Sequence, residues 1–440
     1  MKLIFVIIFF LLLSNCSFDN KSGVWKNENI KSEIENKTFS EFKKILTAGE
    51  VFEKSIKPKN LKLNLPEPIT NSSWNDIYFR HNNNSQNFKF DNSNNVVLKS
   101  KKISRKLVNE LIIYEEGNII INNSKGDIIV YSLKEDREIL KFNFYKKKYK
   151  KIKKEINYIV ENNIIYAADN LGYLYSLNYK TGKLLWAKYY NIPFSSNLKI
   201  YKNKIAVSNQ NNNLKIFNKN TGELIQLIPT EETTVKTEFK NSLSMNNYNS
   251  LFFLNSFGSL YSINFDTMKV NWFNNFNQSF QISSTNLFLG NQILNNDNVI
   301  VLSSNTKTYL IDQQNGSIIS SFNFFTKIKP IIIENYIFLL SENDFLIALD
   351  IFEKKIIYSL DIANFSKKNI KIKKDQIYKD IMILNGKIFI FLNNSNILIF
   401  DINGKFDGKM KLPSKIHSFP ISIENSILFL DNKNKLIVLN

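Results

Sequence analysis

The side chains able to act as nucleophiles, acids or metal ligands are few and scattered in this chain of 440 residues. It has one cysteine, two histidines (His81 and His417) and 39 Asp and Glu residues. Calcium and zinc sites need several ligands held close together, and the carboxylates form no cluster along the sequence. There is no Gly-rich phosphate loop, metal-ligand spacing or nucleophile motif. We therefore predict no catalytic residue, metal ligand or cofactor site, and interpret both histidines as surface or packed residues.

The amino terminus has the features of an export signal. Lys2 precedes an unbroken apolar run, Leu3–Leu13, which is typical of a signal peptide and too short to span a bilayer. We therefore predict a signal peptide over residues 1–15 and a mature protein outside the cytoplasm.

The only cysteine, Cys16, stands directly after this signal. The segment LSNC (13–16) resembles the bacterial lipobox, in which the cysteine thiol is lipidated and the residue becomes the new first one. Asn15 departs from the small residue that usually precedes the cysteine, and Ser17 favours outer-membrane over inner-membrane retention. We predict lipid on Cys16. The alternative is an ordinary signal peptide with an incidental cysteine.

The formal net charge is +19, from 58 Lys and Arg residues. One interpretation is that lysine is simply the default surface residue. The other is attraction to anionic lipid headgroups or to an acidic partner domain. Because an exported chain does not meet nucleic acid, and no nucleic-acid motif is present, we exclude nucleic acid as a partner.

Residues 16–73 are polar and predict a lipidated N terminus followed by a tether. Apolar residues near helical spacing between Phe39 and Ile56 predict a short amphipathic helix. Pro58, Pro66 and Pro68 then predict an extended linker.

From residue 74 to residue 440 the chain consists of short β-rich runs separated by polar turns. Eight copies of a repeat can be aligned on an apolar residue that closes the second run, at intervals of 38 to 51 residues. These anchor residues are Leu133, Leu177, Phe217, Ile263, Ile311, Leu349, Phe400 and Leu439. A period of this length without a helical pattern predicts an all-β fold, an eight-bladed β-propeller with one four-stranded antiparallel blade per repeat.

The second copy, GYLYSLNYKTGKLLW (172–186), shows the elements of one blade. Gly182 predicts a positive-φ turn between the third and fourth strands. Trp186 stands nine residues after its anchor, as do the other aromatic residues Phe142, Trp272 and Tyr358. We predict that these aromatic side chains bridge neighbouring blades.

The ends of the chain predict how the ring closes. The eighth copy stops at Asn440 without an outer strand, whereas residues 95–103 form a β-rich run without a blade. We predict that residues 95–103 complete the last blade, which would remove two open strand edges.

The Thr-Gly-Lys turn followed by Trp resembles the repeat of the pyrroloquinoline-quinone-type propeller family. One branch of that family, the quinone-dependent dehydrogenases, implies calcium held by acidic and amide side chains, an Asp base and often a vicinal disulfide. The lone cysteine and dispersed carboxylates argue against that branch. The order of lipobox, tether and eight-bladed propeller resembles instead the BamB-type lipoproteins of the outer-membrane β-barrel assembly machinery.

The resemblance to BamB-type lipoproteins implies a non-enzymatic periplasmic scaffold without a cofactor, held at the outer membrane by its lipid. It implies docking onto the periplasmic domains of the central barrel protein, as a monomer within a complex. Two alternatives stay open: a quinone (PQQ)-dependent dehydrogenase-like propeller, and a propeller lipoprotein that binds another envelope partner.

Three loops between blades are candidates for partner binding, and propeller topology predicts that they share one face. Residues 145–155 and 365–375 interleave lysines with Ile or Tyr, and residues 228–241 fall where BamB-type proteins carry partner contacts. The alternative for the basic loops is an ordinary solvated charge run. The candidate partner-binding residues are Lys147, Lys148, Lys151, Lys154, Lys236 and Phe239.

Overall fold

The computed structural model describes residues 16–18, 25–27, 52–58, 63–145, 149–237, 239–277, 288–304, 307–369 and 377–440. The chain divides into two units, residues 1–51 and 52–440. In the first unit, β1 (Cys16–Phe18) pairs with β2 (Trp25–Asn27) in antiparallel fashion. The predicted signal peptide and residues 39–51 of the predicted helix lie outside the described residues. Residues 52–58 are not helical, and Ile56 forms an isolated antiparallel bridge with Ser359.

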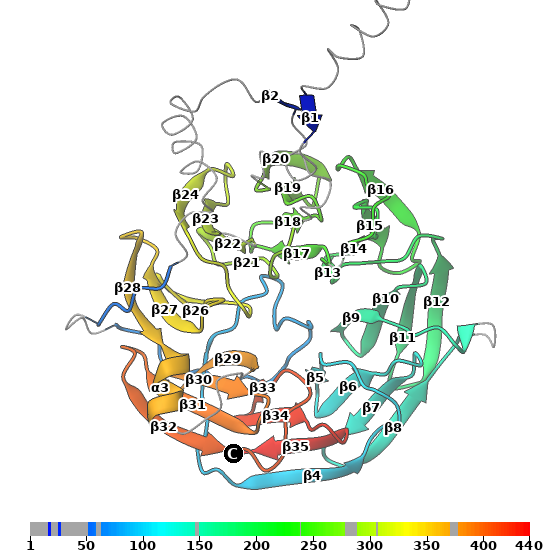
Figure 1. Ribbon diagram of the computed structural model, residues 1–440. Coiled ribbons are helices and arrows are strands. Elements are labelled where there is room, and N and C mark those ends of the chain that lie inside the picture. The colour runs from blue at the N-terminus through cyan, green and yellow to red at the C-terminus, as the bar shows by residue number, and fades with distance from the viewer. Residues whose placement is uncertain are drawn as a thin grey trace, which may run out of the picture. The chain divides into compact units, whose positions relative to one another are not determined.

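The second unit is a ring of eight sheets, which confirms the predicted propeller (Figure 1). Blade 1 is β5 (Ile113–Glu115), β6 (Asn118–Asn122), β7 (Ile128–Ser132) and β8 (Arg137–Phe142). Blade 2 is β9 (Ile156–Glu161), β10 (Ile164–Asp169), β11 (Tyr173–Asn178) and β12 (Lys183–Tyr189). Blade 3 is β13 (Lys199–Tyr201), β14 (Lys204–Ser208), β15 (Leu214–Asn218) and β16 (Leu224–Ile228). Blade 4 is β17 (Ser242–Met245), β18 (Ser250–Leu254), β19 (Ser259–Asn264) and β20 (Lys269–Asn275).

The remaining blades follow the same order from the axis outward. Blade 5 is β21 (Leu294–Asn295), β22 (Val299–Ser303), β23 (Thr308–Asp312) and β24 (Ile318–Phe322). Blade 6 is β25 (Ile331–Ile333), β26 (Tyr336–Leu340), β27 (Phe345–Asp350) and β28 (Lys355–Asp361). Blade 7 is β29 (Tyr378–Leu384), β30 (Lys387–Leu392), β31 (Asn396–Asp401) and β32 (Phe406–Lys411), with β3 (Asn87–Phe88) added parallel to β29. Blade 8 is β33 (Ile421–Ile423), β34 (Ser426–Leu430), β35 (Lys435–Leu439) and β4 (Val96–Lys102).

The ring closes as predicted, because β4 is the outer strand of blade 8. It pairs antiparallel with β35, with Leu98 opposite Val438. The backbone of Asn95 also exchanges two hydrogen bonds with Asn440, of 3.0 and 3.1 Å. Segments more than 300 residues apart in sequence thus form one sheet, and neither β35 nor β4 is left without a neighbour in the ring.

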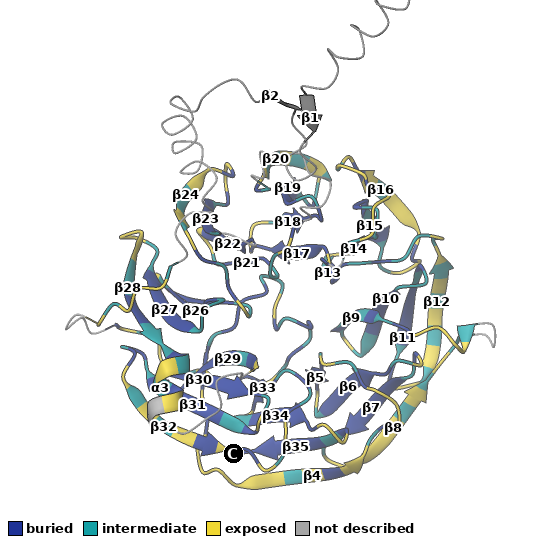
Figure 2. Ribbon diagram, viewed as in Figure 1, coloured by how far each residue is buried: buried dark blue, intermediate teal, exposed yellow. Residues whose placement is uncertain are grey.

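Burial follows the position of each strand in its blade. The middle strands, such as β6 and β7, are buried along their whole length, whereas the outer strand β12 alternates between exposed and half-buried residues (Figure 2). Middle strands are covered by a blade on each face, so they are apolar throughout rather than alternating. Outer strands face solvent on the rim.

Aromatic side chains on the outer strands connect neighbouring blades, as predicted. Trp186 lies against Gly222 in the next blade's turn, and its Nε1 donates to the Lys219 carbonyl at 3.1 Å. Trp272 repeats this arrangement with Gly316 and the Gln313 carbonyl, at 3.2 Å. Tyr358 lies against Gly404 and its hydroxyl donates to the Ile402 carbonyl at 3.1 Å. The glycine is needed because a side chain at the turn would occupy the space of the ring.

The prediction that Phe142 has this role in blade 1 is wrong. The β-bulge that precedes the anchor lies between Val130 and Tyr131, so the anchor of blade 1 is Tyr131 and not Leu133. The residue nine positions later is Leu140, and its side chain is the one that reaches Gly182 of blade 2. The apolar run around residue 131 allowed two registers, and the bulge selects between them.

In the described part of the ring, the helix α3 (Ile362–Asn369) lies at the start of the predicted basic loop 365–375. Asp361 precedes it and accepts a hydrogen bond from the Asn364 backbone N–H at 2.8 Å, which is the geometry of an N-cap. Residues 370–376 of that loop lie outside the described residues.

The segment predicted to be an extended linker packs on the propeller from residue 63 onward. Leu63 is buried against blade 7, and the amide of Asn71 donates to the Ser422 carbonyl of blade 8 at 2.8 Å. Ile69 exchanges backbone hydrogen bonds with Asn87 and Lys89. The prolines exclude regular structure in this segment, but they do not keep it away from the ring.

Candidate functional site

The axis of the propeller is occupied by residues 74–91, which bond to all eight blades in order. The first contacts join Trp74 to Tyr114 of blade 1 and Asn75 to Val160 of blade 2. The last contacts are those of β3 with blade 7 and of Asp91 with the Asn425 carbonyl of blade 8, at 3.0 Å. The segment therefore makes one circuit of the axis inside the ring of innermost strands (Figure 1).

In the middle of this circuit, side-chain amides of asparagines form the hydrogen bonds to the blades. Asn83 is fully buried and donates to the carbonyls of Leu243 and Ile293, at 2.8 and 2.7 Å. Asn84 donates to the Ile332 carbonyl at 2.7 Å and accepts from the Ile332 N–H at 2.9 Å. An amide side chain offers both donors and an acceptor, so each Asn can pair with the backbone of an innermost strand that has no further neighbour in its sheet.

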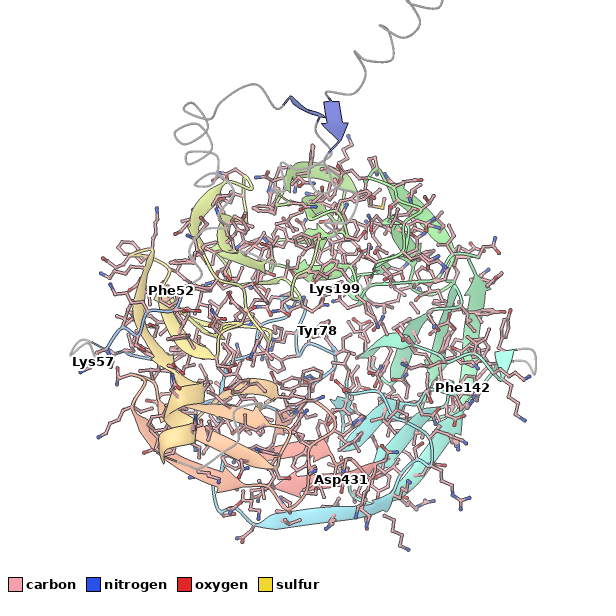
Figure 3. The ribbon with its side chains drawn as sticks, in the orientation of Figure 1. Phe52, Lys57, Tyr78, Phe142, Lys199 and Asp431 are labelled. Atoms are coloured by element: carbon pink, nitrogen blue, oxygen red, sulfur yellow. The ribbon has the colours of Figure 1, made fainter. Side chains whose placement is uncertain are left out.

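A buried ion pair fixes the same segment to blade 3. Lys199 Nζ lies 2.6 Å from Asp76 Oδ2, and both side chains are almost completely buried. The ammonium also donates to Asn83 Oδ1 at 2.7 Å and to the Arg80 carbonyl at 3.2 Å. Figure 3 shows Lys199 near the centre of the ring, close to Tyr78 of the axial segment. Burial lowers the pKa of Lys199 because the charged form loses its hydration, while Asp76 opposes this effect.

Two cavities lie at the axis, one on each side of the axial segment 74–91. The first, of about 460 Å³, is lined by Trp74, Tyr78 and Ser85 and by segments that lead from one blade into the next. The second, of about 420 Å³, is lined by His81, several asparagines and the turns between first and second strands of blades 4 to 6. Because the strands of a blade are antiparallel, these two sets of loops emerge on opposite faces of the ring.

Both histidines are packed in hydrogen bonds. His81 Nε2 lies 3.0 Å from Asn247 Oδ1, and burial lowers its pKa. His417 Nε2 lies 2.9 Å from the Val108 carbonyl. Each ring thus contacts a polar atom of the scaffold, in agreement with the packed-residue interpretation.

Two of the three predicted partner loops meet on one face of the ring. Lys240, at the end of loop 228–241, forms an ion pair with Glu155 at 2.8 Å, and Lys153 lies 3.5 Å from the same carboxylate. A groove of about 210 Å³ lies between them and is lined by Lys236, Phe239 and Pro193 among others. We refer to this region as the loop face.

The candidate residues differ in their accessibility on the loop face. Lys151 and Lys236 are exposed. Phe239 is 6% exposed and packs edge-on against Phe288, with ring centroids 5.2 Å apart. It contributes to the wall of the groove from within the core.

Lys154, by contrast, is 3% exposed and is not a surface lysine. Its Nζ donates to the Tyr149 carbonyl and lies 5.2 Å from the centroid of the Tyr145 ring. Burial lowers its pKa. Lys147 and Lys148 lie outside the described residues. The sequence shows the lysine run but not which lysine turns inward.

A calcium-bound quinone does not fit the residues at the axis. Calcium takes six to eight oxygen ligands, several from carboxylates. Within the described ranges, no group of three His, Cys, Asp or Glu residues comes together in a way that could hold a metal. Residues 74–91 also run through the axis and separate its two cavities. We therefore derive no step through a quinone.

Among the helices that the structure describes, none is long and apolar enough to cross a membrane.

Comparison with solved structures places this fold among known propellers. BamB from Moraxella catarrhalis aligns with a TM-score of 0.61 at 11% identity, over 78% of this chain and 100% of that one. The quinohemoprotein alcohol dehydrogenase from Comamonas testosteroni aligns with a TM-score of 0.59 at 10% identity, over 83% and 80% of the two chains. A europium-containing methanol dehydrogenase aligns with a TM-score of 0.58 at 12% identity, over 83% and 89%. At such identities the similarity shows the fold alone.

Comparison of the sequence itself tests family membership, which structural similarity at these identities does not. No curated protein matches the chain. A family model described as "Outer membrane protein assembly factor BamB" matches residues 101–322, just over half of the chain. This range covers blades 1 to 5, in which the inter-blade contacts of Trp186 and Trp272 lie. The chain therefore belongs to the outer membrane protein assembly factor BamB family, whose members carry the pyrroloquinoline-quinone-like propeller repeat.

Proposed function

We propose that this protein is a non-enzymatic scaffold that assists the assembly of β-barrel proteins into the outer membrane. The observation that carries the proposal is membership of the BamB family, through the match over residues 101–322. Fold alone would not support it, because quinone dehydrogenases have propellers of similar geometry. The absence of a metal-ligand cluster among the described residues argues against a calcium-bound quinone.

The scaffold is held at the periplasmic face of the outer membrane by lipid on Cys16. This part of the proposal rests on the sequence of residues 1–16. In a Cys16→Ser variant, the protein should appear in the soluble periplasmic fraction or remain unprocessed. The parent should remain with the membrane after a salt wash. A variant that both partitions into the same fraction as the parent and migrates like it on a gel would exclude the lipid anchor.

The loop face is the surface that we assign to the partner. Lys236 is exposed and lines the groove beside the Lys240–Glu155 pair, and Lys151 is exposed in the loop that carries Glu155. Exposed positive charge suits an acidic partner domain, because complementary charge accelerates encounter and selects partners. The partner would be a periplasmic domain of the central barrel-insertion protein, with one copy of the scaffold in the complex.

The direct test is copurification of the barrel-insertion protein with the tagged full-length chain after crosslinking in cells. A Lys151→Glu/Lys236→Glu variant should recover less partner, with a difference that shrinks as salt is raised. The matched control is Lys183→Glu, which reverses an exposed lysine on the outer strand β12. Equal loss in the control would exclude the loop face as the docking site.

A separate measurement tests whether the protein is instead a quinone-dependent dehydrogenase. Stoichiometric uptake of pyrroloquinoline quinone together with dye-linked dehydrogenase activity would overturn the scaffold proposal. Copurification with an unrelated envelope complex would remove only the assembly role.

A further inference from the structure

The larger axial cavity, of about 460 Å³, has the size and lining of a small-molecule site. Its floor is formed by the axial segment 74–91, including Trp74 and Ser85. Its walls come from chain that enters the innermost strands of blades 1 and 5 to 8. The cavity is thus built by most of the ring, and the loop-face groove has a separate lining.

A lysine and an aspartate that lack a direct ion-pair partner line this cavity. Lys329 Nζ donates to the Asn83 carbonyl at 2.7 Å, and Asp380 accepts from the adjacent Ile381 N–H at 2.9 Å. Among the residues that the structure describes, neither side chain forms an ion pair, whereas the neighbouring Lys379 is paired with Glu110 at 2.8 Å.

Burial shifts the pKa values of Lys329 and Asp380 toward their uncharged forms, because neither charge is compensated by an ion pair. Loss of hydration lowers the pKa of Lys329 to about 8 and raises that of Asp380 to about 6, and each charge partly offsets the shift of the other. At neutral pH both groups are still charged. The cavity therefore offers one positive and one negative group, each with unused hydrogen-bonding capacity.

Three uncharged polar groups in the lining are also without partners in the part of the chain that is described. Trp74 and Ser85 are each 7% exposed, and the indole Nε1 and the hydroxyl make no hydrogen bond there. Gln292 Oε1, in the same lining, is an unpaired acceptor.

The lining also contains apolar and aromatic side chains, among them Tyr378, Phe419 and Pro420, and Ile377 stands 66% exposed there. The other charged residues of the lining, Glu110, Lys327 and Lys379, already form ion pairs. An occupant that meets these walls must carry an apolar group. Its polar end must supply both an anion for Lys329 and a cation for Asp380.

We propose that this cavity binds a small zwitterion with an apolar side group, of the amino-acid class. The carboxylate pairs with Lys329, and the ammonium pairs with Asp380. The side group packs against Tyr378, Phe419 and Pro420. A purely anionic ligand would leave Asp380 unpaired, and a purely cationic one would leave Lys329 unpaired, so each would lose one of the two contacts. This inference does not depend on the scaffold function.

The test is isothermal titration calorimetry of the purified full-length protein with three matched probes. L-Phenylalanine carries both charges, 3-phenylpropionate only the negative one, and phenethylamine only the positive one. We expect L-phenylalanine to bind at least tenfold more tightly than either single-charge probe. L-Leucine, titrated in the same way, reports whether an aliphatic group suffices.

Variants assign the binding to this cavity. Lys329→Met and Asp380→Asn should each weaken L-phenylalanine binding at least tenfold, whereas Asp380→Asn should leave 3-phenylpropionate binding unchanged. Ile377→Trp fills the cavity from an exposed position without removing a buried group, and it should abolish binding even if the charge variants fold poorly. Lys180→Met, which breaks an exposed ion pair on blade 2, is the control that should bind normally.

Three results would overturn the proposal. One is absence of heat from every probe. Another is binding of 3-phenylpropionate as tight as that of L-phenylalanine, which would exclude the zwitterion. The third is unchanged binding in the Ile377→Trp variant, which would place any ligand elsewhere.

Discussion

Replacing Lys199 with methionine tests whether the axial segment 74–91 is fixed by a buried ion pair. Methionine keeps most of the length of the side chain but removes the ammonium. The Nζ atom has three partners, and the carboxylate of Asp76 at 2.6 Å is the charged one. With the lysine and aspartate side chains 0% and 4% exposed, water cannot replace the lost contacts in the folded protein.

The expected cost in the free energy of unfolding is about 4 kcal/mol, since removal of one member of a buried pair leaves the other charge uncompensated. Adding Asp76→Asn should recover about 2 kcal/mol of this, because the buried charge is then gone. Asparagine can still accept the hydrogen bond that Asp76 Oδ1 receives from the Tyr78 N–H, at 3.0 Å. The double variant should therefore be more stable than Lys199→Met alone.

The assay is urea unfolding followed by tryptophan fluorescence, together with amide hydrogen exchange of residues 74–91. The matched control is Lys180→Met, whose ion pair with Glu116 has the same 2.6 Å distance but is about half exposed on both sides. Its cost should be at most about 1 kcal/mol. Equal stability of Lys199→Met and Lys180→Met, with unchanged protection of residues 74–91, would refute the reasoning.

Three further predictions concern the blade contacts, the axial cavity and the ring closure. Gly222→Ala should lower the free energy of unfolding by about 2–4 kcal/mol, because its Cβ would meet the Trp186 ring. Gly386→Ala, at a similar φ of +70° with no atom within 4 Å, should cost only about 1 kcal/mol, so equal costs would contradict the Trp186 contact. Asp380 has a pKa of about 6 in the folded protein, above its ordinary 3.8, so the stability that it contributes at low pH is lost as pH rises from about 4 to 6. The unfolding free energy of Asp380→Asn relative to wild type should rise over that interval, and a difference independent of pH would contradict the assignment. Replacement of β4 by a Gly-Ser linker of equal length should lower the urea midpoint and cause association through the exposed edge of β35, as size-exclusion chromatography would show. An unchanged midpoint would contradict closure through β4.

The repeat itself could be predicted because its signals are local. Gly182 adopts positive φ in the turn predicted for it, and Gly222 and Gly316 do so in the equivalent turns of blades 3 and 5. The same spacing argument identified the wrong residue in blade 1, Phe142 instead of Leu140. A strand shifted by two residues keeps the same alternation of side chains, so the sequence pattern is compatible with both registers. Only the bulge between Val130 and Tyr131 distinguishes the two registers.

The candidate docking residues show a second limit of local reasoning. The lysine run at residues 145–155 predicts positive charge correctly, yet Lys154 packs on the Tyr145 ring while Lys151 stays exposed. Likewise, Phe239 is a core residue of the groove wall. Whether a side chain faces solvent depends on what the neighbouring blade places opposite it, and a single repeat does not contain that information.

The sequence by itself determined the period, the number of blades and the strand that closes the ring. These follow from apolar patterns and turn residues that act within one blade, and from the count of strands at the two chain ends. Only the tertiary structure decided the course of residues 74–91, which have no repeat pattern. Their partners are backbone groups of eight innermost strands spread over more than 300 residues, and those groups come together only when the ring closes. The Lys199–Asp76 pair and the cavity lined by the unpaired Lys329 and Asp380 arise in the same way. Both are formed by residues that are far apart in the sequence and meet only at the axis of the assembled ring.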